Sequence, residues 1–182
     1  MTVPWPPPPP PPPLSPAGVP LAEFPQRLLA YMIDMALLTA VAFALFIPAF
    51  VVVFLQIDFP DPYGPEPDFG TVFADYFLPF LLLELGLFAL MMLLYFLYAV
   101  EYMHRSGQTL GKKAMKIRIV PLDPALRLTR GMAAKRYLVE YGGGMLLPFF
   151  SWVDGLWQLG DKPYQQTLHD KFARTVVVKV SP

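Results

Sequence analysis

Residues 28–55 read LLAYMIDMALLTAVAFALFIPAFVVVFL, a stretch of 28 residues whose only charged side chain is Asp34. As a straight helix it is about 42 Å long, against roughly 30 Å for the hydrocarbon core of a bilayer. The stretch therefore predicts a tilted or bent transmembrane helix over about 28–55. Arg27 precedes it and lies seven residues from Asp34, so both side chains share one helix face. A charge within a span costs about 2.5–3.5 kcal/mol, so Asp34 is expected to face a partner or a functional site.

The rest of the composition agrees with a membrane protein. Of 182 residues, 55% are hydrophobic and 15% are charged, and the mean hydropathy is +0.44. This is too apolar for an ordinary soluble domain. Residues 78–100 predict a second transmembrane helix, interrupted only by Pro79 and Glu84. The chain has no cysteine, which excludes disulfides, thiolate nucleophiles and cysteine metal sites.

The distribution of charge predicts the orientation of the spans. Residues 56–77 carry five acids and no Lys or Arg, whereas residues 101–137 carry nine cations against Glu101 and Asp123. Cytoplasmic loops are enriched in Lys and Arg, so we expect the N-terminus and residues 101–137 to be cytoplasmic. Arg27 then lies at the inner interface with Asp34 about 10 Å deeper, and Glu84 lies nearer the outer face.

Residues 138–159 form a third apolar segment that reaches spanning length only if it includes Glu140 and Asp154. A full crossing would place the basic C-terminal tail outside, so we expect a membrane-embedded or re-entrant segment that returns to the cytoplasmic side. Eleven of the 23 prolines lie in the first twenty residues. This composition predicts a disordered proline-rich tail over 1–22, in polyproline II conformation, that acts as a solvated spacer or a docking segment.

Two segments near the ends of the predicted cytoplasmic regions resemble each other. Residues 107–120 read GQTLGKKAMKIRIV and residues 165–178 read QQTLHDKFARTVVV. Each runs from a polar turn into a β-branched stretch, and isolated β-strands need partners for their backbone groups. We expect the two stretches, 117–120 and 175–180, to pair as a small cytoplasmic β element. The candidate residues of this motif are Gln108, Thr109, Gly111, Lys112, Gln166, Thr167 and His169.

The same segments resemble the RDD family of small bacterial membrane proteins, named for one arginine and two aspartates. The resemblance rests on FPQRLLAYMIDMALL (24–38), YAVEYMHRSGQTLGKKAMKIRIV (98–120) and SWVDGLWQLGDKPYQQTLHDKFARTVVV (151–178), and it covers about residues 24–180. It assigns the arginine to Arg27 and the first aspartate to Asp34. The second is Asp154 or Asp170, because both lie in matching stretches. The resemblance implies a multi-pass protein of the bacterial inner membrane.

The expected fold is therefore an all-α membrane protein with two transmembrane helices, an embedded segment and the β element. Two functions of different class remain open. The first is a structural or accessory membrane component, in which Arg27 and Asp34 form an ion pair or a helix contact with a third group such as Asp154. The second, implied by the resemblance, is an ion or small-solute transporter, for example a sodium/proton exchanger, that uses Asp34.

Other kinds of site are disfavoured by the sequence. His169 is next to Asp170, but adjacent residues point apart, so we expect His169 to serve in local turn capping and not as half of an acid/base pair. No serine or cysteine lies in a recognisable catalytic setting, and two histidines without further ligands make a poor metal site. We expect no enzyme activity, no cofactor, no metal and no nucleic-acid partner. The expected partners are the lipid bilayer and either a second copy or another membrane protein.

Overall fold

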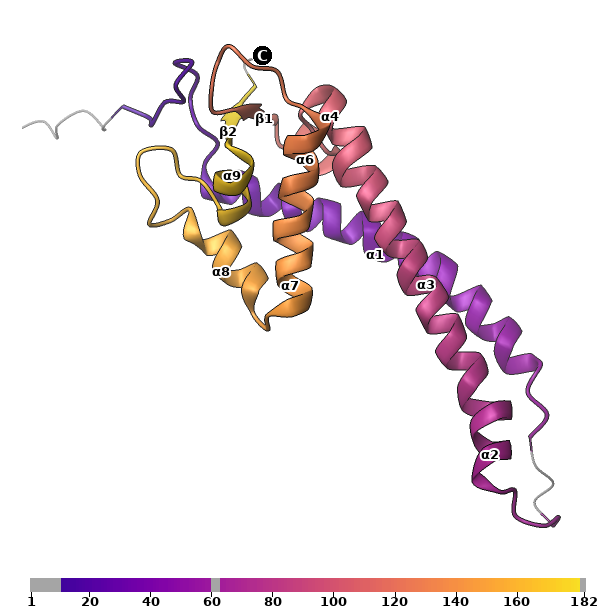
Figure 1. Cartoon of the computed structure of the whole chain (residues 1–182). Helices are drawn as coiled ribbons and strands as arrows, with labels where there is room; N and C mark the ends of the chain where they lie inside the picture. The colour runs from indigo at the N-terminus through magenta and orange to yellow at the C-terminus, as the bar shows by residue number, and fades with distance from the viewer. Residues whose placement is uncertain (1–10, 60–62, 181–182) are drawn as a thin grey trace, which may run out of the picture.

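The computed structural model describes residues 11–59 and 63–180, and it consists of a long helical hairpin with a smaller mixed unit at one end (Figure 1). Helix α1 (Phe24–Leu55) forms one limb of the hairpin. The other limb is one continuous helical rod, and it contains α2 (Phe69–Val72), a π-helical turn (Phe73–Phe77), α3 (Leu78–Phe96), a second π-helical turn (Leu97–Tyr102) and α4 (Met103–Ser106).

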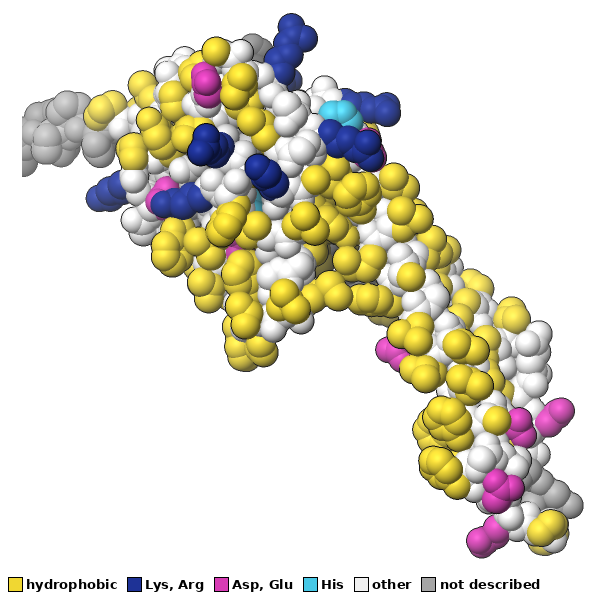
Figure 2. Space-filling model, viewed as in Figure 1, with side chains coloured by type: hydrophobic (Ala, Val, Ile, Leu, Met, Phe, Trp, Pro, Cys, Tyr) yellow, Lys and Arg dark blue, Asp and Glu magenta, His cyan; other side chains and the backbone are white. Residues whose placement is uncertain are grey.

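The hairpin surface is almost entirely exposed and apolar. Helix α1 buries only Ala30, Asp34 and Leu38, and α3 buries no residue. Hydrophobic side chains cover both limbs, acidic ones gather at the far end, and most Lys and Arg side chains lie at the other (Figure 2). Monomeric soluble proteins rarely leave apolar patches of this size uncovered. Within the described residues, only these two limbs are long and apolar enough to cross a membrane, in agreement with the two predicted spans.

The two β-branched stretches pair with each other, as the sequence predicts. Strand β1 (Ile117–Pro121) and strand β2 (Thr175–Lys179) form an antiparallel sheet with Ile119 opposite Val177. Short helices precede both strands, α5 (Leu110–Ala114) before β1 and α9 (Leu168–Ala173) before β2. The sheet packs against the first turns of α1, the end of the second limb and helix α6 (Arg130–Tyr137), and the buried core there contains Ala30, Val100, Ile117, Ile119, Ala133 and Val177.

The third apolar segment turns back on itself. Helix α6 continues through a π-helical turn (Leu138–Gly142) into α7 (Gly143–Leu146), and the chain reverses before α8 (Phe150–Trp157). Both ends of this helical hairpin lie on the side of the sheet (Figure 1). A Cβ atom on Gly143 would lie 2.3 Å from the ring of Phe150, so glycine allows the two arms to approach. The segment thus turns back toward the sheet, as the sequence predicts, and its helices α7 and α8 have four and eight residues.

The predicted disordered tail over 1–22 is wrong for its second half. Residues 1–10 lie outside the described residues, but Leu21 forms a β-bridge with Val178 and Leu14 forms one with Pro20. The Lys179 N–H also donates to Pro20 O at 2.9 Å. Leu21 and Ala22 are buried. The edge of β2 offers backbone groups that this segment satisfies, so burial and hydrogen bonding outweigh its proline-rich composition.

Candidate functional site

Asp34 is held by donors from two separate parts of the chain, Tyr98 in the second limb and residues 109–112 at the start of α5. Its Oδ1 atom accepts from Tyr98 Oη at 2.5 Å and from the Gly111 N–H at 2.7 Å. Its Oδ2 atom accepts from Thr109 Oγ1 at 2.6 Å, and Lys112 Nζ lies 3.8 Å from that atom. Asp34 is only 5% exposed. Both carboxylate oxygens are therefore occupied by protein donors.

Gly111 allows this contact because α5 lies directly against α1. A Cβ atom at position 111 would lie 2.1 Å from Ala30 O and 2.9 Å from Asp34 Oδ1. Thr109 is the N-cap of α5, and its side chain accepts from the Lys112 N–H. The unpaired N–H groups of a helix N-terminus favour a negative charge. The carboxylate of Asp34 thus connects α1 to the start of α5.

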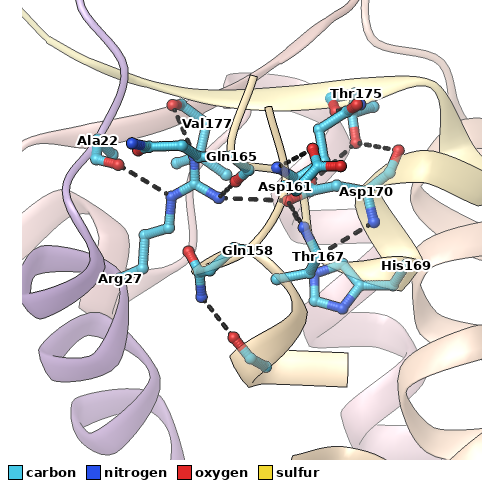
Figure 3. Close-up of polar contacts among 12 residues, drawn as sticks. Ala22, Arg27, Gln158, Asp161, Gln165, Thr167, His169, Asp170, Thr175 and Val177 are labelled. Carbon is cyan, nitrogen blue, oxygen red and sulfur yellow. Dashed lines mark hydrogen bonds and ion pairs between the residues drawn. The ribbon is translucent and has the colours of Figure 1, made fainter. Parts of the chain in front are cut away.

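Asp170 is the centre of a second polar cluster, which includes Arg27 (Figure 3). Arg136 NH1 makes a short ion pair with Asp170 Oδ1, and Arg27 NH1 lies 3.5 Å from Asp170 Oδ2. Thr167 Oγ1 and Thr175 Oγ1 add hydrogen bonds to the same carboxylate at 2.9 and 3.1 Å. Burial alone would raise the pKa of Asp170, but the charges of Arg136, His169 and Arg27 outweigh it and lower that pKa. Asp170 is therefore a buried, charged anchor.

Arg27 connects α1 to the sheet as well as to Asp170. Its Nε donates to Ala22 O at 3.2 Å, NH1 donates to Gln165 O at 2.7 Å, and NH2 donates to Val177 O at 3.2 Å. Four acceptors from separated segments thus surround one guanidinium group, whose planar fork suits such an arrangement. An ion pair between Arg27 and Asp34, one of the two predicted contacts, does not form in the structure. Arg27 binds Asp170 in α9, whereas Asp34 binds Thr109 and Gly111 at the start of α5.

Asp154 binds the second copy of the motif at its helix N-terminus. Its Oδ1 accepts from the His169 N–H at 2.9 Å, and its Oδ2 lies 2.6 Å from His169 Nδ1. The expected local capping role of the His169 side chain is therefore wrong, since the ring contacts α8. Asp154 is 2% exposed. Like Asp34, it is a buried carboxylate on a helix that binds the backbone of a short neighbouring helix.

The two copies of the motif have the same local structure. Gln108 Nε2 donates to Ile117 O at 2.9 Å, and Gln166 Nε2 donates to Thr175 O at 2.8 Å. Thr109 and Thr167 are the N-caps of α5 and α9. The register of the sheet maps onto itself when the copies are exchanged, with Ile119 opposite Val177 at its centre. The repeat is therefore an approximate twofold unit, in which Gly111 and His169 occupy equivalent positions against Asp34 and Asp154.

A cavity of about 530 Å³ lies between the first turns of α1 and the α8–α9 segment. Lys112 lines it and makes only a 3.5 Å contact with Thr109 Oγ1 besides the 3.8 Å approach to Asp34. Burial lowers the pKa of Lys112, and the charge of Asp34 opposes this shift only in part. The other charged or titratable side chains on the wall are those of Arg27, Tyr31, Arg136, Glu140, Tyr141, Asp154, His169 and Asp170. The apolar ones include Leu28, Met32, Trp152 and Leu156.

The structure brings all four signature candidates, Arg27, Asp34, Asp154 and Asp170, to the unit around the sheet, together with both motif copies. Sequence reasoning missed Tyr98, Arg136 and Thr175, which complete the two clusters. Tyr98 lies within the second predicted helix, 78–100, and Arg136 is one of the nine cations of residues 101–137. The hydroxyl group of Tyr98, at the end of an apolar helix, could have indicated a hydrogen-bonding role. No feature of the sequence distinguishes Arg136 from the exposed cations near it.

Comparison with known proteins identifies one family. A model described as the RDD family matches residues 21–174, most of the chain. No curated protein and no solved structure matches it.

Proposed function

The chain belongs to the RDD family, and on that premise we propose that it is a structural or accessory membrane component, with two transmembrane helices that carry a polar unit on the cytoplasmic face. The partners in this proposal are the lipid bilayer and other membrane proteins, and no catalysis or nucleic-acid binding is involved.

The position of Asp34 supports a specific placement in the bilayer. Residues 35–55 of α1 contain no charged side chain and span roughly 32 Å, close to the roughly 30 Å hydrocarbon core. The segment before them is held by the sheet and α5. We therefore place the inner boundary of the bilayer near Asp34, so that this carboxylate lies at the boundary and not 10 Å inside it. Exposed cations such as Arg105, Lys113 and Arg130 then face the inner leaflet, as in a bacterial inner membrane protein with a cytoplasmic N-terminus.

The hydrogen bonds to Asp34 are the observation that supports a structural function for the signature residues. A carboxylate that exchanges ions must release its ligand, whereas Asp34 receives three hydrogen bonds of 2.5–2.7 Å from Tyr98, Gly111 and Thr109. Hydrogen bonds to a charged group contribute about 1.5–3 kcal/mol each. Such an arrangement favours a stable contact between α1 and α5 over a site that binds and releases an ion.

The test compares flux and folding in one set of variants. Wild type, Asp34→Asn and Asp123→Asn are reconstituted into vesicles, where Asp123 is an exposed loop acid and serves as the matched control. We expect no sodium- or pH-driven flux above empty vesicles for any of the three. We also expect a lower yield of folded protein for Asp34→Asn alone. A saturable flux in wild type that Asp34→Asn abolishes without loss of folded protein would overturn the proposal.

Transport of an ion or small solute is the second candidate, and the cavity beside α1 favours it. Its volume of about 530 Å³ is within the usual range for small-molecule sites, and the polar side chains of Lys112, Glu140 and His169 lie on its wall. In this alternative the solute binds in the cavity, and the charge of Asp34 raises the pKa of the neighbouring Lys112. The flux experiment distinguishes the two candidates directly.

A further inference from the structure

Glu84 is an ionisable side chain on the exposed face of the second limb. It lies in α3 and makes no hydrogen bond or ion pair with any residue that the structure describes. Leu81, Leu85 and Phe88 lie on the same helix face by their spacing, and they are 45%, 55% and 51% exposed. Glu84 is thus a lone acid in an apolar stripe that no other part of the described chain covers.

Its depth makes this exposure costly in a bilayer. Tyr98, which contacts Asp34, marks the inner boundary proposed above, and Glu84 lies 14 residues or about 21 Å along the helix from it. About 9 Å of helix remains to the outer end of α3 at Leu78. Glu84 therefore lies well inside the hydrocarbon region, where acids almost always face a protein partner or water.

We propose that the face of α3 around Glu84 binds a transmembrane helix of another membrane protein that carries a Lys or Arg side chain in the outer half of its span. This inference rests on the proposed accessory function and specifies the partner. A carboxylate in a low-dielectric medium is stabilised most by an opposite charge at contact distance. The leucine and phenylalanine side chains beside Glu84 provide the apolar surface that packs around such a pair.

A second copy of this chain does not provide that charge. Residues 28–104 contain no Lys or Arg, so neither limb has a cation at the depth of Glu84. Two copies that met on this face would bring one carboxylate against another. Charge complementarity therefore favours a different protein over self-association.

The experiment measures helix association in vesicles with the full-length protein. The probe is a polyleucine helix of about 21 residues with one lysine about 9 Å from its outer end, and the same peptide with leucine at that position is the reference. Energy transfer between labelled protein and labelled peptide reports binding. Protein variants are wild type, Glu84→Gln and Glu66→Gln, the last being an exposed acid in the outer loop.

We expect the lysine peptide to bind wild type and Glu66→Gln about threefold to thirtyfold more tightly than the leucine peptide, and Glu84→Gln to show no preference. Equal binding of the two peptides by wild type, or a preference that survives in Glu84→Gln, overturns the proposal. Self-association of wild type that Glu84→Gln abolishes also overturns it, in favour of a homodimer. Flux that depends on Asp34 would remove the accessory function without changing the peptide result, so the two failures are distinguishable.

Discussion

Replacement of Gly111 by alanine tests whether the contact between α1 and α5 holds the fold together. The added Cβ would lie 2.1 Å from Ala30 O and 2.9 Å from Asp34 Oδ1, both of which belong to α1. Neither is the flexible end of a long side chain, so α5 has to move away. That movement breaks the 2.7 Å hydrogen bond from the Gly111 N–H to Asp34.

The expected loss of stability follows from three effects. Overpacking of a close contact costs about 1–3 kcal/mol. Loss of a hydrogen bond to a charged group costs about 1.5–3 kcal/mol. Alanine recovers up to about 1 kcal/mol because it favours the helix over glycine. The net destabilisation is therefore about 1.5–5 kcal/mol, which corresponds to a decrease of about 3–20 °C in the unfolding midpoint for a chain of this size.

The assay is thermal unfolding in detergent, followed by circular dichroism, with Gly131→Ala as the matched control. Gly131 occupies the same second position after a threonine N-cap, in α6, but the nearest atom to its added Cβ is Thr129 Oγ1 at 3.8 Å. Gly131→Ala should unfold at or slightly above the wild-type midpoint. Equal midpoints for the two variants would refute the reasoning, because both gain the same helix preference and only one meets a clash.

Three further predictions concern the other buried charges. Asp170→Asn should destabilise the fold by about 3–5 kcal/mol because it leaves two arginines without their anion. The folded pKa of Asp170 lies below its unfolded value near 3.9, so the stability that its charge contributes is present above pH 3.9 and is lost as the pH falls toward the folded pKa. The unfolding free energy of Asp170→Asn should therefore decrease less than that of wild type when the pH is lowered through this range. Burial lowers the pKa of Lys112 below its unfolded value near 10.4, so wild type should gain stability as the pH rises toward that value. Lys112→Met should lack that gain when denaturation is measured at a series of pH values. A double-mutant cycle of Asp154→Asn and His169→Gln should give a coupling of about 0.5–3 kcal/mol in unfolding free energy, and additive effects would exclude their direct contact.

The two long apolar helices and the pairing of the repeated motif could be predicted because each depends on a local pattern. An apolar run of more than twenty residues predicts a helix long enough to cross a membrane without reference to its neighbours. The β-branched ends at 117–120 and 175–180 similarly predict strands that need a partner, and their flanking sequences match. Ordering of Leu14–Ala22 was not predictable from composition, because it depends on the free edge of β2.

The sequence predicts that Asp34 needs a partner, because a charge within an apolar run has a large desolvation cost. Asp154 and Asp170 were candidates only through the family resemblance, and the partners of Arg27, Asp34, Asp154 and Asp170 depend on the tertiary structure. Arg27 and Asp34 share a helix face, yet Arg27 binds Asp170 and the sheet while Asp34 binds Thr109, Gly111 and Tyr98. Spacing along one helix fixes the direction of a side chain, whereas the approach of α5 and α9 to that helix is set by packing between segments far apart in the chain. The four charged residues therefore form three separate contacts: Arg27 with Asp170, Asp34 with the start of α5, and Asp154 with His169. Arg27 and Asp34 do not form an ion pair.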